Sequence, residues 1–398
     1  MLKVQEYLVN KSNEIGTKLG ALEALKQEFG IKYRLYPEDS MVLLDYDQIN
    51  SPKSHPIVIE CRSLILCCHT FGVVSRKFDR FFNYGECPEY YEDFDFSKAQ
   101  VFEKVDGSLI GIYYNFFTDK WEISTRGMAK AEGPHSFYPS FRDCVLDTFG
   151  FRDEDHFQTV FGDLSLRHWT YEEAIECERI DRRYYTFVFE CIGPKNKCVK
   201  RYDDAEMVCL GVIENFTGKT LHKKDIYVEH ILSRDFGLYV RLPKVYEASD
   251  AESIVKMVSE FKDLDEGVVA FDPVSNKRVK IKSATYVAAH KLRGNDPVPT
   301  KKNLLTVIFE GEVDELLAYF PEFKEYVYPI VEEVNSTKAE LSRIWEEVQN
   351  IETQKDFALA VKNFKFSNVL FEARKTQQAV EKVFEGMSLN YKLKLFGA

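Results

Sequence analysis

The chain has 398 residues, of which 45% are hydrophobic and 29% charged, and its formal net charge is −11. This composition is typical of a folded protein long enough for two domains, and it argues against disorder. Apolar runs such as Leu64–Cys68 have only the length of a strand, so no membrane-spanning helix is expected. The acidic net charge argues against a nucleic-acid partner unless basic residues are concentrated locally. They are concentrated between Lys277 and Lys302, which hold eight Lys or Arg and one acid.

Cysteine usage indicates a reducing compartment. The nine cysteines are an odd number, and none of them forms a C-x-x-C pair. The chain starts without an apolar signal segment. We therefore expect free thiols, no zinc site and an intracellular, cytoplasmic location.

The first half of the chain is predicted to begin with a helix and to continue as strands. Residues 1–30 have apolar residues at helical spacing and end at Gly30, which predicts one helix. Short strands separated by turn residues follow up to about Lys282. Three of these strands are expected to form a meander: 101–104, 109–114 and 121–125.

Further along, buried strands are predicted over 185–192 and 207–213, and a hairpin over 268–281. The stretch 143–183 is more helical. Two prolines in 294–300 suggest a linker, after which the spacing of apolar residues becomes helical. The helices expected there cover 327–351, 355–363 and 367–385. The sequence thus predicts an α+β domain of antiparallel sheets flanked by helices over 1–293, and a small all-α domain over 294–398.

The segment Glu103-Lys104-Val105-Asp106-Gly107-Ser108 carries the first chemical motif. A lysine amine can attack the α-phosphate of a nucleotide only when it is deprotonated, and neighbouring cations in a partly desolvated pocket lower its pKa. The glycine permits a tight turn. The short K-x-D-G pattern also fits a solvated turn lysine, with Asp106 in a simple turn-forming role.

Three further segments carry charged residues on predicted strands. Glu190 follows Phe187-Val188-Phe189, and a buried carboxylate needs a ligand hydroxyl, a cation or a metal as its partner. Glu266 precedes an apolar strand and could hold a divalent metal. Lys280 and Lys282 are two residues apart on a strand, so both amines project to one face and can neutralise phosphate charge. A buried salt bridge or an exposed polar strand face would explain each of these residues without function.

In this order the motifs resemble those of the covalent nucleotidyltransferases, which include DNA ligases, RNA ligases and capping enzymes. The flanking segments resemble the bacteriophage RNA ligase 1 family, which repairs cleaved tRNA anticodon loops. The segments that carry this resemblance are Ile59-Glu-Cys-Arg62-Ser63-Leu64, Ser75-Arg-Lys-Phe-Asp-Arg80-Phe-Phe-Asn-Tyr84, Ser124-Thr-Arg126-Gly127 and Gly193-Pro-Lys-Asn196. Ser63 stands where the family usually has glycine, and Arg80 where lysine is common.

The resemblance implies a ligase-type adenylyltransferase domain in which AMP becomes attached to Lys104. Asp106, Lys280 and Lys282 would assist that reaction, and Mg²⁺ or Mn²⁺ would be held by Glu266 and Glu190. The residues implied to bind ATP are Arg62, Arg80, Glu103, Arg126, Glu190, Lys280 and Lys282.

The implied reaction is the ATP-dependent joining of an RNA 3′-hydroxyl to a 5′-phosphate. The helical C-terminal domain would select the RNA, with candidate RNA-facing cations at Lys291, Arg293, Lys301 and Lys302. No phosphate-binding loop of the G-x-x-x-x-G-K-S/T type is present, so we expect a separate end-healing kinase or phosphatase. A monomer is the default expectation.

Two alternatives stay open at this point. A capping-type guanylyltransferase or a DNA ligase would use the same lysine chemistry, although helical spacing after Thr300 replaces the barrel expected of both. A catalytically silent RNA-binding protein on the same fold would be expected to have lost some of Lys104, Glu190, Glu266, Lys280 and Lys282, all of which are present.

Overall fold

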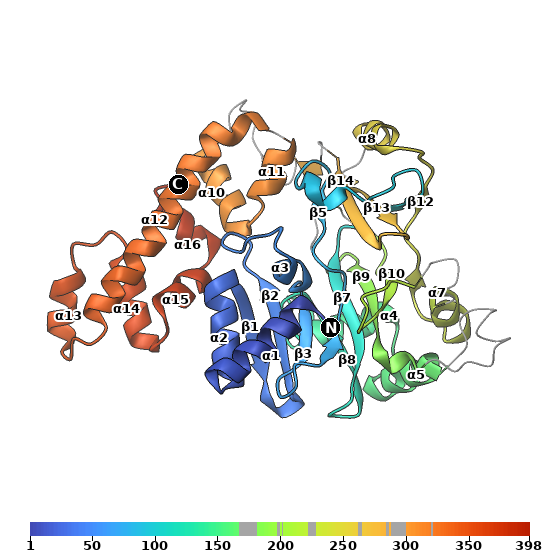
Figure 1. The fold of residues 1–398 in the computed structure, drawn as a ribbon, viewed down its shortest axis with the longest axis horizontal. Coiled ribbons are helices and arrows are strands. Elements are labelled where there is room, and N and C mark those ends of the chain that lie inside the picture. Colours follow the sequence, from blue (N-terminus) through green and yellow to red (C-terminus); the bar gives the residue numbers. More distant parts are fainter. Residues whose placement is uncertain are drawn as a thin grey trace. The chain divides into compact units, whose positions relative to one another are not determined.

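The computed structural model describes residues 1–166, 181–196, 200, 202–221, 228–261, 265–283, 286–287, 300–319 and 321–398. The chain divides into two compact units, Met1–Tyr286 and Val287–Ala398 (Figure 1). The expected junction at residues 293 and 294 falls outside the described residues and stays a prediction. Among the helices of the described residues, none is long and apolar enough to cross a membrane.

Strands of the first unit form three sheets. The four-stranded sheet has the order β1 (Ile31–Tyr36), β2 (Met41–Tyr46), β3 (Leu64–Cys67), β4 (Val73–Ser75). One five-stranded sheet has the order β11 (Val240–Arg241), β10 (Glu206–Glu214), β9 (Tyr185–Ile192), β7 (Ser108–Asn115), β8 (Lys120–Ser124). The other has the order β12 (Val245–Tyr246), β6 (Gln100–Glu103), β13 (Gly267–Asp272), β14 (Lys277–Lys282), β5 (Phe82–Asn83). Neighbouring strands are antiparallel except in the β10–β11 and β14–β5 pairs.

The helices of the first unit cover the outer faces of these sheets (Figure 1). They are α1 (Lys3–Ile15), α2 (Lys18–Phe29), α3 (Pro56–Glu60), α4 (Phe141–Phe149), α5 (Glu154–Leu166), α7 (Val228–His230) and α8 (Ala251–Ser259). One apolar core joins α1, α2 and α3 to the four-stranded sheet. A second joins α4 and α5 to the β9–β7–β8 side, and a third joins α8 to β6, β13 and β14. The inner faces of the sheets are thereby left to face one another.

The second unit is helical over its described residues. Its helices are α10 (Lys301–Glu310), α11 (Val313–Tyr319), α12 (Lys324–Val348), α13 (Gln354–Val361), α14 (Ser367–Thr376), α15 (Val380–Gly386) and α16 (Leu389–Leu395). Apolar residues of α10, α11 and α12 form its core. The expected fold class, an α+β domain with an all-α C-terminal part, is therefore confirmed.

Three local predictions were wrong. Residues 1–30 form two helices, because Gly16 adopts a left-handed φ of 83° that ends α1, and Thr17 then caps α2. The predicted meander of 101–104, 109–114 and 121–125 is wrong for its first strand. That strand, β6, pairs with β12 and β13 in another sheet, and only β7 and β8 form a hairpin. The stretch 367–385 is broken where Gln377 takes a φ of 53°.

A lysine lies buried between the inner faces of two sheets. Lys77 is only 1% exposed, and its Nζ donates a hydrogen bond of 2.8 Å to the Ser63 hydroxyl. Ser63 adopts a left-handed φ of 56°, which explains why glycine is common there in the family that the sequence resembles. On the opposite sheet, Gly111 leaves the room for this lysine, because a Cβ there would lie 2.4 Å from Lys77 Cε.

Gly111→Ala is therefore expected to lower the free energy of unfolding by about 1–3 kcal/mol, because a fully buried lysine cannot move aside. Gly162→Ala is the matched control: a Cβ at this position in α5 meets no atom within 4 Å. That change is expected to stabilise the protein by about 0.5–1 kcal/mol through helix propensity. Thermal unfolding is expected to show a lower melting temperature for Gly111→Ala and a higher one for Gly162→Ala. Equal changes in melting temperature for the two variants would contradict the packing argument.

Candidate active site

One carboxylate holds two of the predicted lysines. The Lys104 Nζ lies 2.6 Å from Glu266 Oε1, and the Lys282 Nζ lies 2.9 Å from the same oxygen. The Glu266 side chain is 5% exposed and that of Lys104 is 20% exposed. The predicted segments of Lys104, Glu266 and Lys282 thus meet at one buried carboxylate.

Strand pairing brings these three residues together. β6 ends at Glu103, and the Lys104 N–H donates to the carbonyl of Gly267, which pairs with Lys282 across the β13–β14 hairpin. Gly267 has a φ of 139°, and a Cβ there would lie 2.1 Å from the Ile281 carbonyl oxygen. Only glycine allows this close approach of two backbones, which places Glu266 beside both lysines.

Glu190 on β9 is the second carboxyl group of the site. Within the described part of the chain its side chain makes no hydrogen bond or ion pair, so the expected partner is not found among these residues. Burial raises the pKa of Glu190 to about 8, against the opposing charge of Lys104, and the charge of Glu266 adds to the rise. Burial would also raise the pKa of Glu266, but Lys104 and Lys282 outweigh it and lower that pKa. The site therefore holds one ionised and one protonated carboxyl group at neutral pH.

The Asp106-Gly107 turn is fixed by the backbone of a neighbouring segment. Asp106 Oδ2 accepts a hydrogen bond of 2.8 Å from the Lys200 N–H, and its own N–H donates to the Tyr202 hydroxyl. A Cβ at Gly107 would lie 2.5 Å from the Cys191 carbonyl oxygen. Glycine is needed here for the close approach to β9.

The charges of four predicted nucleotide-binding residues act on the hydroxyl of Tyr46, the last residue of β2. Burial would raise the pKa of Tyr46, but the surrounding cations lower it to about 8. In order of their effect these cations are Arg126, Arg80, Arg62 and Lys280. A buried position where four cations converge is suited to a multiply charged anion such as a polyphosphate.

Each arginine of this cluster is held by neutral or acidic neighbours. Arg80 donates from Nη1 to the Tyr46 hydroxyl at 2.9 Å and from Nη2 to Glu86 at 2.7 Å. The Arg126 Nε lies 3.2 Å from an oxygen of Asp45. Arg62 donates to the Phe78 carbonyl, and both it and Lys280 lie over the ring of Phe81. Tyr46 and Glu86 were missed in the sequence because nothing in their local pattern links them to Arg80.

A cavity of about 150 Å³ opens beside Lys104. Arg62, Glu103 and Glu190 also line it, and most of the remaining wall is apolar, with the aromatic rings of Phe78, Phe81, Phe102 and Phe271. Ligand sites usually measure about 300–1,000 Å³, so this space fits a nucleobase rather than a whole nucleotide. The base would lie between the two five-stranded sheets, with the phosphates toward Lys104 and the cations around Tyr46.

The other predicted site residues have the following positions. The Glu103 side chain lines the cavity but is ion-paired with Arg241 at 3.1 Å. In the second unit, Lys301 pairs with Glu333 at 2.9 Å, and Lys302 is exposed. Lys291 and Arg293 fall outside the described residues.

Comparison with known proteins gives a family match. Residues 60–286 match the model of the RNA ligase family of the T4 RNA ligase 1 type. A putative bifunctional polynucleotide kinase/RNA ligase of Autographa californica nuclear polyhedrosis virus is 31% identical over 84% of this chain, which spans only 44% of that protein. An RNA ligase of Rhodothermus phage RM378 is 22% identical over 82% of this chain and 80% of its own length. A solved Naegleria gruberi RNA ligase mutant with ATP and Mn is 16% identical over 55% of this chain and 58% of its own, with a TM-score of 0.36.

The raised pKa of Glu190 predicts a pH dependence of stability. In the unfolded chain this carboxyl titrates near 4.5, and in the folded protein near 8, so the folded state binds the extra proton between these values. Stability from this group is therefore present at low pH and is lost as the pH rises through that window. Glu190→Gln has no group that ionises here, so it does not lose this stability as the pH rises. The melting temperature of the variant minus that of the wild type is therefore expected to increase from pH 5 to pH 8.

Thermal unfolding of the ligand-free protein across that range checks the prediction. Glu38→Gln is the matched control, because Glu38 is exposed. Parallel pH profiles for wild type and Glu190→Gln would contradict the assignment of a protonated Glu190.

Proposed function

The chain belongs to the RNA ligase family, and from this premise we propose that it joins RNA 3′-hydroxyl and 5′-phosphate ends with ATP through a lysine–AMP intermediate. The family assignment agrees with the enzyme class expected from the sequence, an ATP-dependent RNA ligase. The observation that carries the mechanism is the contact of Lys104 and Lys282 with one Glu266 oxygen, beside a cavity of nucleobase size.

In the first step, a bond forms between the Lys104 nitrogen and the α-phosphorus of ATP, and the bond from that phosphorus to the bridging oxygen of pyrophosphate breaks. The ion pair with Glu266 must open first, because the nitrogen needs a free lone pair. The amine loses its proton to water, since Glu266, with its lowered pKa, is a weak base. Lys282 and Lys280 stabilise the charge that develops on the α-phosphate.

The leaving pyrophosphate would be bound by the cations around Tyr46. Arg62, Arg80 and Arg126 present guanidinium groups there, which bind phosphate oxygens in pairs. Arg80 carries two such donors, now bound to the Tyr46 hydroxyl and to Glu86. When pyrophosphate binds, the Arg80 guanidinium would donate one of these hydrogen bonds to a phosphate oxygen and stay in the same position.

A divalent cation fits beside these residues. Glu266 and Glu190 are hard oxygen donors close enough for the charge of one to raise the pKa of the other. We infer that they hold Mg²⁺ or Mn²⁺ together with nucleotide phosphates, as Mg²⁺ is usually bound. The ion would supply further charge stabilisation at the α-phosphate.

The second and third steps use the same residues. The 5′-phosphate of an RNA end attacks the lysine-bound AMP, the phosphorus–nitrogen bond breaks, and a 5′-5′ pyrophosphate forms. An RNA 3′-hydroxyl then attacks the 5′-phosphorus of the RNA, and AMP leaves. Lys104 is the nucleophile only in the first step, so the third step requires only that the activated end be held in place.

The biological substrate we propose is a broken RNA such as a cleaved tRNA anticodon loop, held through the helical second unit. We propose that the RNA-selecting domain begins near residue 294, and that Lys301 and Lys302 at the start of α10 are RNA contacts. A separate kinase or phosphatase would prepare the ends. The protein would act as a soluble monomer inside the cell.

Replacing Lys104 tests the covalent step. With α-labelled ATP and Mg²⁺, the wild type is expected to retain label through denaturing electrophoresis, and Lys104→Ala to retain none. Lys98→Ala is the control, since Lys98 is a lysine paired with Asp95 and 63% exposed. Lys104→Ala should still seal 5′-adenylylated RNA without ATP.

An unlabelled wild type, after pyrophosphate treatment to remove AMP already bound, would exclude the lysine–AMP mechanism and favour the silent RNA-binding alternative. Labelling by GTP in place of ATP would instead indicate a capping-type enzyme.

Tyr46→Phe tests the phosphate cluster. Without the hydroxyl, Arg80 loses the hydrogen bond that holds its fork among the other cations, so the KM for ATP is expected to rise by about tenfold. The final amount of lysine–AMP at saturating ATP should stay as in the wild type. Tyr33→Phe is the matched control, because its hydroxyl bonds to Glu23 away from the site. An unchanged KM would remove Tyr46 from the nucleotide site.

A further inference from the structure

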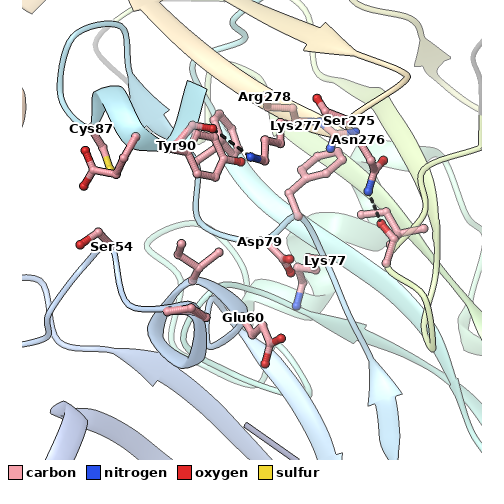
Figure 2. Close-up of a pocket in the computed structure, with 17 residues that line it drawn as sticks. Ser54, Glu60, Lys77, Asp79, Cys87, Tyr90, Ser275, Asn276, Lys277 and Arg278 are labelled. Carbon is pink, nitrogen blue, oxygen red and sulfur yellow. Dashed lines mark hydrogen bonds between the residues drawn. The ribbon is translucent and has the colours of Figure 1, made fainter. Parts of the chain in front are cut away.

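A second and larger cavity, of about 420 Å³, lies in the first unit. Figure 2 shows Tyr90 and the hairpin residues Ser275 to Arg278 on one side of it and Ser54 and Glu60 on the other. Its size falls within the range of about 300–1,000 Å³ that is typical of ligand sites. Neither Lys104 nor Glu190 lines it, so this space is separate from the cavity at the active site.

Two of the acids that line this cavity already have partners. Asp79 accepts hydrogen bonds from Arg76 at 3.0 and 2.7 Å. Glu60 accepts the backbone N–H groups of Lys3 and Val4 at the start of α1. Both carboxylates are thus already engaged by donors, and the third acid of the lining, Glu89, is exposed to solvent.

Arg278 and Lys77 line this cavity, and neither has an acidic partner among the described residues; Lys77 is buried and donates to the Ser63 hydroxyl. The Arg278 guanidinium lies between the rings of Phe78 and Phe271, at 4.1 and 4.3 Å from their centroids. Nη2 donates to the Thr220 hydroxyl at 2.7 Å. The stacking fixes the plane of the guanidinium and leaves other N–H donors of the fork for a ligand. Lys277, by contrast, is paired with Asp93 at 2.5 Å.

Arg278 also continues the row of active-site cations. Along β14 every second side chain points to the same face, so Arg278, Lys280 and Lys282 share one face while Val279 and Ile281 are buried on the other. Together with Phe78 and Phe81, Arg278 lines both cavities. A charged strand with the adenylylation site at one end thus reaches the second cavity at its other end.

We propose that the 420 Å³ cavity binds one nucleotide of the RNA substrate, with its phosphodiester held by Arg278. The aromatic faces of Phe81 and Tyr90 would contact the base or sugar, and Ser54, Ser275 and Asn276 can hydrogen-bond to the ribose hydroxyls. The identity of the ligand as RNA rests on the proposed function, whereas the phosphate chemistry rests on Arg278.

Binding of a fluorescein-labelled single-stranded RNA oligonucleotide, followed by anisotropy without ATP at several salt concentrations, tests the site. Arg278→Met is expected to weaken binding by about tenfold and to reduce the slope of log K against log salt by about 0.7, the value for one lost phosphate contact. Ser54→Trp, at the exposed rim, should weaken binding to a similar degree by filling the cavity and keeping the nucleotide from Arg278.

Arg152→Met is the matched control, because Arg152 is exposed on the turn before α5 and lines neither cavity. Wild-type affinity and slope in Arg278→Met, or wild-type affinity in Ser54→Trp, would overturn the proposal. A raised KM for ATP in Arg278→Met with unchanged RNA binding would also overturn it, since Arg278 would then serve the nucleotide cavity alone. RNA binding that depends on Arg278 in a protein that forms no lysine–AMP would support this site while refuting the ligase mechanism.

Discussion

The carboxylate of Glu266 is the interaction on which the site depends. One oxygen holds the amines of Lys104 and Lys282, which come from the end of β6 and the end of β14. Because β13 lies between these two strands, the strand order of a single sheet sets the distance between the two amines. The close backbone approach at Gly267 then brings Glu266 to them. A change in that sheet would separate Lys104 from its neighbours without altering any of the three charged residues.

The second carboxyl group has the opposite character because its surroundings differ. Burial would raise the pKa of Glu266, but two ammonium groups outweigh it and lower that pKa, whereas burial raises the pKa of Glu190 to about 8 against the charge of Lys104, and the charge of Glu266 adds to the rise. Two carboxyl groups with separated pKa values are typical of sites that hold a cation and donate a hydrogen bond at once. The ionised group suits a metal or an amine, and the protonated group can donate to a ligand oxygen until a cation arrives.

The residues that the structure brings together around Glu266 could be predicted from short patterns, but the partners of the other site residues could not. Lys104, Glu266 and Lys282 lie in segments whose strand character is evident from local composition, and the structure brings them together. The contact of Arg80 with Tyr46 joins residues 34 apart in the sequence, and no local pattern records such a pairing. The same reason explains the error in the meander, since strand periodicity locates β6 but not the sheet that it joins. The breaks at Gly16 and Gln377 depend on single left-handed residues within otherwise helical spacing.

The wall between the two cavities would couple the proposed nucleotide site to the proposed RNA site. Phe78, Phe81 and Arg278 line both spaces, and Lys280 and Arg62 lie over the same Phe81 ring. An anion bound at Arg278 would therefore contact a guanidinium that is stacked on Phe78, and both side chains also line the proposed nucleotide cavity. Close-packed aromatic walls transmit small displacements because they contain few voids. A ligand in one cavity can thus change the shape of the other through contacts already present. Nucleotide binding and RNA binding could then depend on each other without a separate moving element.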